Sequence, residues 1–287
     1  MALPASFIRD GFLPAADIRK RRCLPHLKRP GIMIGTDGLT NTGKTEFALS
    51  APTPGIFIPI DRGFDGCLDN PNPPNSRMRD WGFKVIQAPL STQSTQPEYL
   101  KYWKEFYGEF KRALDNPDCM TVVLDGDSDS WELQRLAEFG KLTQIPSIMY
   151  TNVNAARRAM IARAWDSGKI IIATNKVEDE YVVKTDAQGN PIVGSDGKEM
   201  RVKSGNLIRQ GFKDQDYLWQ IQIQHLHKEA YINSITKREV PQQWGLRITK
   251  CKPNPPLQGL ELWGSDCNFA GLVQVVYPHV SLAEWGL

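Results

Sequence analysis

Short, nearly continuous apolar runs alternate with segments of helical periodicity as far as residue 175. Such runs are typical of strands that are buried on both faces of a sheet. Their alternation with helices predicts the α/β class, in which helices cover both faces of a mostly parallel sheet. The predicted strands span residues 31–36, 55–60, 83–88, 119–126 and 169–175, and the predicted helices span residues 44–51, 96–117, 130–142 and 154–168.

After residue 180 the pattern changes to the alternation that is typical of β-strands. Two glycine-bearing turns between β-rich runs predict a hairpin or small meander at 181–203, inserted into the core. Strand-like alternation continues at 217–227, 229–240 and 244–252. The dense prolines and asparagines of 69–80 predict a loop. The expected domains are a basic amino-terminal arm at 1–30, a core at 31–265 that contains the insertion, and a tail at 266–287.

The composition excludes few functions. Of the 287 residues, 41% are hydrophobic and 23% are charged, as in ordinary globular proteins. The net charge of +3 does not by itself indicate a nucleic-acid-binding protein. The apolar runs are too short to span a membrane, and the amino terminus does not resemble a secretory signal. A cytoplasmic protein without a membrane partner is therefore expected.

The cysteines and histidines give no sign of a metal centre. The five cysteines are scattered without a C-x-x-C pair, which argues against a disulfide framework and against a cysteine zinc site. His225 and His227 alternate along one predicted strand, so they lie on the same face of it. They are expected to be polar side chains on a solvated sheet face.

Residues 38–45, Gly-Leu-Thr-Asn-Thr-Gly-Lys-Thr, match the phosphate-loop pattern G-x-x-x-x-G-K-[ST] at every fixed position. The glycines let the backbone curl so that its N–H groups point at a phosphate, and Lys44 adds a positive charge. Thr45 offers a hydroxyl to Mg²⁺, and the helix predicted after the loop begins at the anion. ATP and Mg²⁺ are therefore the expected cofactors. The residues expected to bind the nucleotide are Gly38, Leu39, Thr40, Asn41, Thr42, Gly43, Lys44, Thr45 and Glu46.

A phosphate loop of this kind needs a carboxylate beside the magnesium ion. The apolar strand at 119–126 ends in Asp125, which is the pattern of a Walker B strand. Thr45 and Asp125 are accordingly the candidate metal residues. Asp129, which follows in the same turn, is expected to cap the next helix.

Three further short motifs occur in a definite order: Asp61-Arg62-Gly63 after a strand, Asn175 at the end of a strand, and the K-x-K pair Lys250 and Lys252. In this order the chain resembles the RecA-like ATPases, and most of all their phage branch, which is linked to single-strand DNA annealing and recombination. The resemblance implies a RecA-like P-loop NTPase core with a β-rich carboxyl-terminal part. It also implies Mg²⁺-dependent ATP hydrolysis that DNA stimulates, with Lys44, Asp61, Asp125 and Asn175 as the catalytic residues.

The resemblance assigns a role to each motif. Asp61 would polarise the attacking water, although it is equally compatible with a turn cap. Asn175 would sense the γ-phosphate. Lys250 and Lys252 would reach the ATP of a neighbouring subunit, where positive charge is needed.

The mobile DNA-binding loops of RecA-like proteins follow two central strands, which correspond here to residues 142–158 and 176–212. Basic side chains there would bind the phosphates of single-stranded DNA without sequence preference. Alternatively, the 181–203 hairpin is a solvent-exposed decoration with ordinary lysines. The implied partners are single-stranded DNA, further copies of the chain in a filament or ring, and a single-strand-binding protein. The implied DNA contacts are Lys176, Lys184, Lys198, Arg201, Lys203 and Arg209.

Two other functions remain open at the level of the sequence. A P-loop kinase would transfer the phosphoryl group to a small molecule under an arginine-rich lid, to which Arg157, Arg158 and Arg163 are suited. A nucleotide-dependent scaffold would bind ATP, hydrolyse it very slowly and recruit other proteins. In that case Asp61 would be a structural turn residue.

Overall fold

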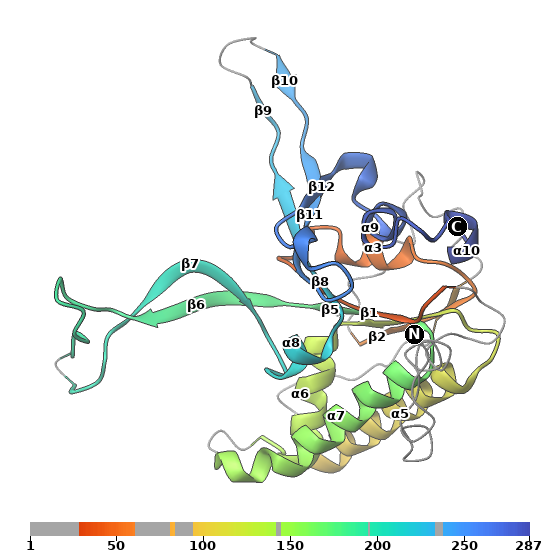
Figure 1. Ribbon diagram of the computed structural model, residues 1–287. Coiled ribbons are helices and arrows are strands. Elements are labelled where there is room, and N and C mark those ends of the chain that lie inside the picture. The colour runs from red at the N-terminus through yellow and green to blue at the C-terminus, as the bar shows by residue number, and fades with distance from the viewer. Residues whose placement is uncertain (1–28, 61–80, 84–93, 142–144, 195, 233–237) are drawn as a thin grey trace, which may run out of the picture.

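An eight-stranded, mostly parallel sheet forms the centre of the computed structural model (Figure 1). The structure describes residues 29–60, 81–83, 94–141, 145–194, 196–232 and 238–287. Neighbouring strands are parallel from β8 to β3, whereas β11 and β12 are antiparallel to their neighbours. The α/β prediction is thus confirmed. The strand order is β12 (Glu261–Trp263), β11 (Gln243–Cys251), β8 (Ile221–Lys228), β1 (Ile32–Asp37), β5 (Ile170–Asn175), β4 (Thr121–Asp125), β2 (Gly55–Pro59) and β3 (Trp81–Phe83).

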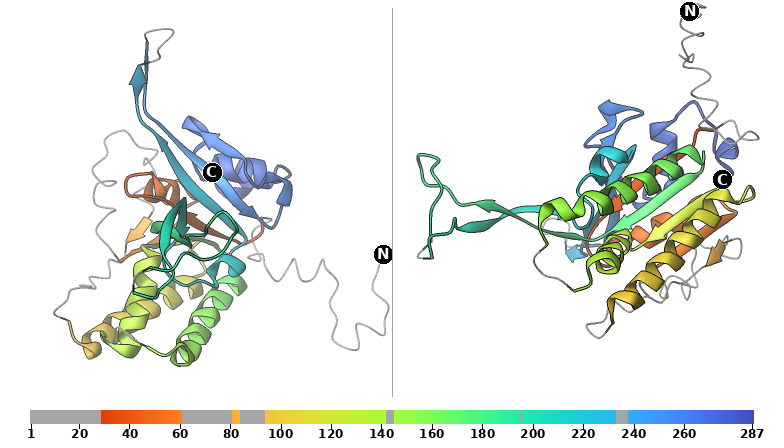
Figure 2. Two further views of the ribbon diagram at one scale, coloured as in Figure 1. Left: turned by 90° about the vertical axis from the view of Figure 1, so that its left-hand side faces the viewer. Right: turned by 90° about the horizontal axis from the view of Figure 1, so that it is seen from below.

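Helices cover both faces of this sheet, as Figures 1 and 2 show. One face carries α5 (Gln96–Asp115), α6 (Asp127–Phe139) and α7 (Tyr150–Asp166). The other face carries α3 (Lys44–Leu49) and α9 (Phe269–Val276), and α10 (Leu282–Trp285) completes the same core. Because successive side chains of β1 point to opposite faces, Ile32 and Ile34 belong to one core and Met33 to the other.

The helix α5 illustrates how the sequence specifies these layers. Phe106, Phe110 and Leu114 recur at helical spacing and are buried against the sheet. The side chains of Thr95 and Glu98 form a capping box that fixes where the helix begins. The predicted bounds of 96–117 are therefore nearly those observed.

Other predicted elements need correction. The helix α7 begins at Tyr150, so most of the predicted DNA loop at 142–158 is helical. The short helix α8 (Gln215–Leu218) replaces the start of the predicted strand at 217–227. The loop predicted at 69–80 and most of the predicted strand at 83–88 lie outside the described residues, as does nearly all of the predicted amino-terminal arm.

A long two-stranded ribbon projects from the sheet beyond β5 (Figure 1). It consists of β6 (Val177–Val183) and β7 (Arg201–Arg209), and we call residues 177–209 the long hairpin. Its outer part folds into two turns, closed by bridges between Thr185 and Pro191 and between Val193 and Glu199. The predicted hairpin with two turns is confirmed, but it extends beyond 181–203 at both ends.

Short elements complete the described chain. A second ribbon of β9 (Tyr231–Ile232) and β10 (Glu239–Val240) prolongs β8 and β11. None of the helices within the described ranges is both long and apolar enough to cross a membrane. The remaining elements are the 3-10 helices η2 (Ser147–Met149), η3 (Pro255–Leu257) and η4 (Gly264–Asp266).

Candidate functional site

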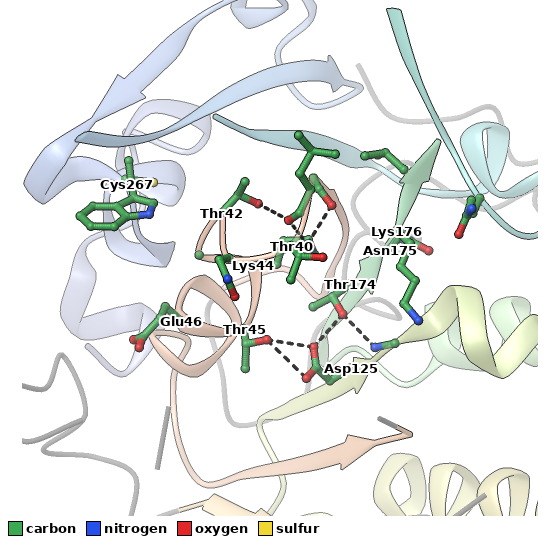
Figure 3. A pocket seen from close by; sticks show the side chains of 18 of the residues that line it. Thr40, Thr42, Lys44, Thr45, Glu46, Asp125, Thr174, Asn175, Lys176 and Cys267 are labelled. Atoms are coloured by element: carbon green, nitrogen blue, oxygen red, sulfur yellow. Dashed lines mark hydrogen bonds between the residues drawn. The ribbon is translucent and has the colours of Figure 1, made fainter. Parts of the chain in front are cut away.

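A cavity of about 830 Å³ opens at the carboxyl ends of β1, β4 and β5 (Figure 3). The carboxyl ends of parallel strands meet at one edge of a sheet, which is where α/β proteins usually bind ligands. The cavity is lined by the whole predicted phosphate loop, residues 38–46, together with Asp125 and Asn175. Residues far apart in the sequence are thus brought together as the motifs predict.

The loop after β1 has the backbone geometry that its glycines permit. Gly43 has φ of 91°, in the left-handed region that favours glycine. At Gly38 a Cβ atom would lie 2.6 Å from Oγ1 of Thr42 and 3.0 Å from Cβ of His225, so any side chain there would clash. The chain can therefore curl tightly before α3 begins.

The lysine of the loop lies over the backbone of the loop itself. Its Nζ donates hydrogen bonds to the carbonyl oxygens of Gly38, at 2.8 Å, and Leu39, at 2.6 Å. Thr42 Oγ1 also donates to the Leu39 carbonyl, at 2.8 Å. The ammonium group of Lys44 is thus held at the cavity wall.

A hydroxyl and a carboxylate meet at the edge of the same cavity. Thr45 Oγ1 lies 3.3 and 3.4 Å from the two carboxylate oxygens of Asp125. Thr174 Oγ1 donates to Asp125 Oδ1 at 2.7 Å and accepts from the backbone N–H of Gly126 at 2.9 Å. Asp125 is only 3% exposed, so this contact orients its carboxylate toward Thr45 (Figure 3).

These groups fit a magnesium ion. Mg²⁺ prefers oxygen ligands and is usually held by one or two carboxylates together with the phosphates of a nucleotide. The Thr45 hydroxyl and the Asp125 carboxylate supply such oxygens. Within the described ranges no cluster of three or more histidine, cysteine, aspartate or glutamate side chains offers a self-sufficient metal site. The phosphates of a bound nucleotide would offer further oxygen ligands to such an ion.

Asn175 and Lys176 form the wall where β5 leaves the sheet. Asn175 is 1% exposed, and its side-chain nitrogen donates to the carbonyl of Ala173 at 3.2 Å, while Oδ1 has no partner within the described structure. Lys176 Nζ lies 2.8 Å from Asp129. Asn175 thus lies at the end of β5 and in the cavity wall, and its role as a sensor of the γ-phosphate stays a prediction.

The predicted lysine pair lies outside this cavity. Lys250 donates to the carbonyl of Asp216, and Lys252 donates to that of Tyr217, at 2.6 Å. Desolvation, together with the charge of Lys252, lowers the pKa of Lys250. Among the described residues neither lysine lines the cavity of its own chain, so a contact with a neighbouring subunit stays a prediction.

Asp61 lies outside the described residues, and so do Arg62 and Gly63. The backbone N–H of Ile60, the residue before Asp61, donates to the carbonyl of Asp125 at 3.0 Å. The chain therefore passes beside Asp125 just before it reaches Asp61. The catalytic role of Asp61 stays a prediction.

Four of the basic residues expected to bind DNA lie exposed on the long hairpin. Lys184, Lys198 and Arg201 are exposed on the outer part of the long hairpin. Lys203 is also exposed but is paired with Asp179 at 2.6 Å. The sequence of the long hairpin contains six acidic and five basic residues, so it carries no excess of positive charge for phosphates.

Arg209 needs a correction. Its side chain is 6% exposed and forms an ion pair with Asp37, at 2.5 and 2.7 Å, and a second with Asp216, at 2.9 Å. Burial raises the pKa of Asp37, and the pairing with Arg209 offsets part of that rise. Arg209 is therefore a structural link between the long hairpin and the strand before the phosphate loop, and it is not available to DNA.

His225 also departs from the prediction. It is 4% exposed and lies beneath the phosphate loop, edge-on to Phe47 with ring centroids 5.6 Å apart. Both ring nitrogens are buried, and the backbone of Thr42 lies near enough to interact with the ring. His227, two residues further along β8, is the one that reaches solvent. The two histidines share a face of the strand, but the phosphate loop covers only the first of them.

The burial of His225 predicts a pH-dependent stability. Burial, with the charge of Lys44 adding to it, lowers the pKa of His225 from 6.5 to about 3. Between these two values the unfolded chain binds a proton that the folded chain does not, so stability falls as the pH is lowered. From pH 8 to pH 5 we expect His225 to account for a loss of about 2 kcal/mol.

Urea unfolding at both pH values tests this expectation. In the His225→Phe variant the loss between pH 8 and pH 5 should shrink by that amount, whereas the exposed control His227→Phe should behave as the unaltered protein does. An unchanged loss in the His225→Phe variant would show that the buried imidazole is not the titrating group.

Several residues of the cavity wall escaped sequence reasoning: Gly126, Thr174, Val177, Gln210, Trp244, Gly264 and Cys267. Thr174 precedes the predicted sensor Asn175, but only the adjacency of β5 and β4 brings it to Asp125.

Neither the known family models nor the curated proteins that were compared with the sequence give a match. The interpretation of the site therefore rests on its motifs and its geometry.

Proposed function

We propose that the protein is a Mg²⁺-dependent ATPase of the RecA-like kind, which binds single-stranded DNA and promotes annealing or recombination as an oligomer. One observation carries the nucleotide part of this proposal. Lys44 and Thr45 of a complete phosphate loop line one cavity with Asp125, whose carboxylate lies within 3.4 Å of the Thr45 hydroxyl. These groups recur together in P-loop enzymes that catalyse phosphoryl transfer.

The residues of the loop would act mainly by binding and electrostatics. The backbone N–H groups of residues 38–45 would surround the phosphates of the nucleotide. Lys44 would exchange its hydrogen bonds to the carbonyls of Gly38 and Leu39 for contacts with the phosphates, whose negative charge it would neutralise. A bound Mg²⁺ supplies positive charge at the phosphate oxygens. Thr45 offers its hydroxyl to that ion, and Asp125 accepts hydrogen bonds on the same side.

The DNA part of the proposal rests on the resemblance and on the exposed cations of the long hairpin. Lys184, Lys198 and Arg201 are free to approach a phosphate backbone. Because the hairpin as a whole is not basic, we expect DNA binding to depend strongly on the assembled oligomer, where several copies add their cations. A protein that does not assemble should accordingly bind DNA weakly.

The placement of the three arginines on α7 does not favour the kinase alternative. Arg157 is buried and paired with Asp127, while Arg163 is paired with Asp115 at 2.7 Å. Arg158 is paired with Asp214. All three arginines lie on α7 rather than on a lid, so they are not disposed to close over a phosphoryl group.

Measuring ATP hydrolysis with and without single-stranded DNA, over a salt series and alongside the mass of the complex, tests the proposal. We expect hydrolysis that requires Mg²⁺, rises with DNA and loses this stimulation at high salt. ADP formation that requires a nucleoside or another acceptor would instead favour a kinase. Tight ATP binding with negligible turnover would favour the scaffold.

The Asp125→Asn variant tests the proposed metal site. Asparagine keeps the size of the side chain but removes the charge that would hold Thr45 and the ion in place. We expect turnover at saturating ATP to fall about 10–100-fold and the Mg²⁺ concentration for half-maximal activity to rise. A Mg²⁺ titration of hydrolysis measures both, and an unaltered titration curve would contradict the assignment of Asp125.

A further inference from the structure

The cavity continues past the phosphate loop, away from the proposed metal site. Figure 3 shows Glu46 and Cys267 on one side of Lys44, and Asp125 and Thr174 on the other. Trp244 and Gly264 belong to the same wall of the cavity. Its volume, about 830 Å³, lies in the range of about 300–1,000 Å³ that holds complete small ligands. A triphosphate chain alone would leave much of it unused.

The indole of Trp244 is held beside the loop by the β8–β11 ladder. Trp244 is paired with His227 across the two strands, and the two rings lie 5.5 Å apart at an angle of 39°. Its Cδ1 atom lies 3.9 Å from the position of a Cβ atom on Gly43. The residue is 39% exposed, although its ring contacts that of His227. The indole is thus a pre-positioned aromatic surface at the edge of the phosphate loop.

We propose that this end of the cavity is a nucleobase site, in which the base of the bound nucleoside triphosphate stacks on the indole of Trp244. The inference rests on the proposed nucleotide binding by the phosphate loop. The terminal phosphate must face Thr45 and Asp125, where the metal site lies, so the nucleoside extends toward the opposite end. The chemical class of ligand is therefore a nucleoside triphosphate, and its base is recognised by its aromatic face.

Glu46 gives a second, independent reason to place a nucleoside there. It lines the cavity, and its Oε2 atom is buried without a hydrogen-bond partner within the described structure. A buried acceptor without a partner is unfavourable until a donor reaches it. The hydroxyl groups of a ribose are such donors, whereas an ionised triphosphate chain has none to offer.

Stacking on an indole favours large aromatic surfaces and discriminates little between bases of equal size. We therefore expect purine nucleotides to bind more tightly than pyrimidine nucleotides.

Calorimetric titration with ATP and with inorganic tripolyphosphate, both with Mg²⁺, separates the base from the phosphates. The unaltered protein should bind ATP more tightly. Trp244→Ala should weaken ATP binding about 10-fold or more and leave tripolyphosphate binding unchanged, whereas Trp244→Phe should retain most of the ATP affinity. The control Tyr231→Ala removes an exposed aromatic side chain further out on the same ribbon and should bind both ligands normally.

Each outcome has a definite meaning. Equal losses of ATP and tripolyphosphate affinity in Trp244→Ala would show that the indole only shapes the loop, and would overturn the base site. Unchanged ATP affinity in that variant would overturn it as well. Failure of the unaltered protein to bind either ligand would instead refute the phosphate-loop assignment, and the base site with it.

Discussion

Replacing Lys44 with alanine is expected to reduce the rate of ATP hydrolysis by at least about 100-fold while the protein stays folded. The reason is electrostatic. The ammonium group would stabilise charge that develops on the transferred phosphoryl group, and the described cavity wall offers no equivalent in its place except Lys176, whose Nζ is paired with Asp129. Folding should be little affected, because Lys44 lies in the wall of the cavity rather than in the hydrophobic core, with its Nζ donating to the carbonyls of Gly38 and Leu39.

A steady-state measurement of phosphate release, with thermal unfolding of the same samples, checks both halves of this expectation. Lys104→Ala is a matched control, since Lys104 is an exposed lysine on α5, away from the cavity. The control should keep the full rate. If Lys44→Ala hydrolysed ATP as fast as Lys104→Ala does, the loop would not be a catalytic phosphate site.

The central sheet could be predicted because its strands are buried on both faces. Nearly continuous apolar runs such as Ile170–Asn175 leave few alternatives to a parallel sheet under helices. The phosphate loop could be predicted because its chemistry fixes both residue types and spacing within eight consecutive residues. Asp125 could be predicted as the carboxylate of the site because it ends an apolar strand.

The rest of the site depends on strand order, which one sequence does not specify. Thr174 becomes a partner of Asp125 only because β5 lies between β1 and β4. Trp244 reaches the loop only because β11 pairs with β8 rather than with another strand. Arg209 was predicted to contact DNA for the same reason: the sequence does not show that its side chain forms an ion pair with Asp37.

Replacing Arg157 with methionine is expected to lower the free energy of unfolding by about 3–5 kcal/mol. Arg157 and Asp127 are each 1% exposed and form an ion pair between α7 and α6. Arg157 also donates to Ser130 Oγ at 2.8 Å, and Gln215 of α8 donates to the other carboxylate oxygen of Asp127 at 2.5 Å. Removing the guanidinium would leave a buried carboxylate without its charge partner, which is far more unfavourable than the loss of one contact.

The same helix supplies the control. Arg163 of α7 forms an ion pair with Asp115, but both side chains are exposed, so Arg163→Met should destabilise the protein much less. Urea unfolding of the two variants gives the comparison. The double variant Arg157→Met, Asp127→Leu should recover much of the loss, because it removes the unpaired charge together with its partner and fills the space with apolar groups. If Arg157→Met were no less stable than Arg163→Met, the buried pair would not hold α6 and α7 together, and packing of their apolar faces alone would suffice.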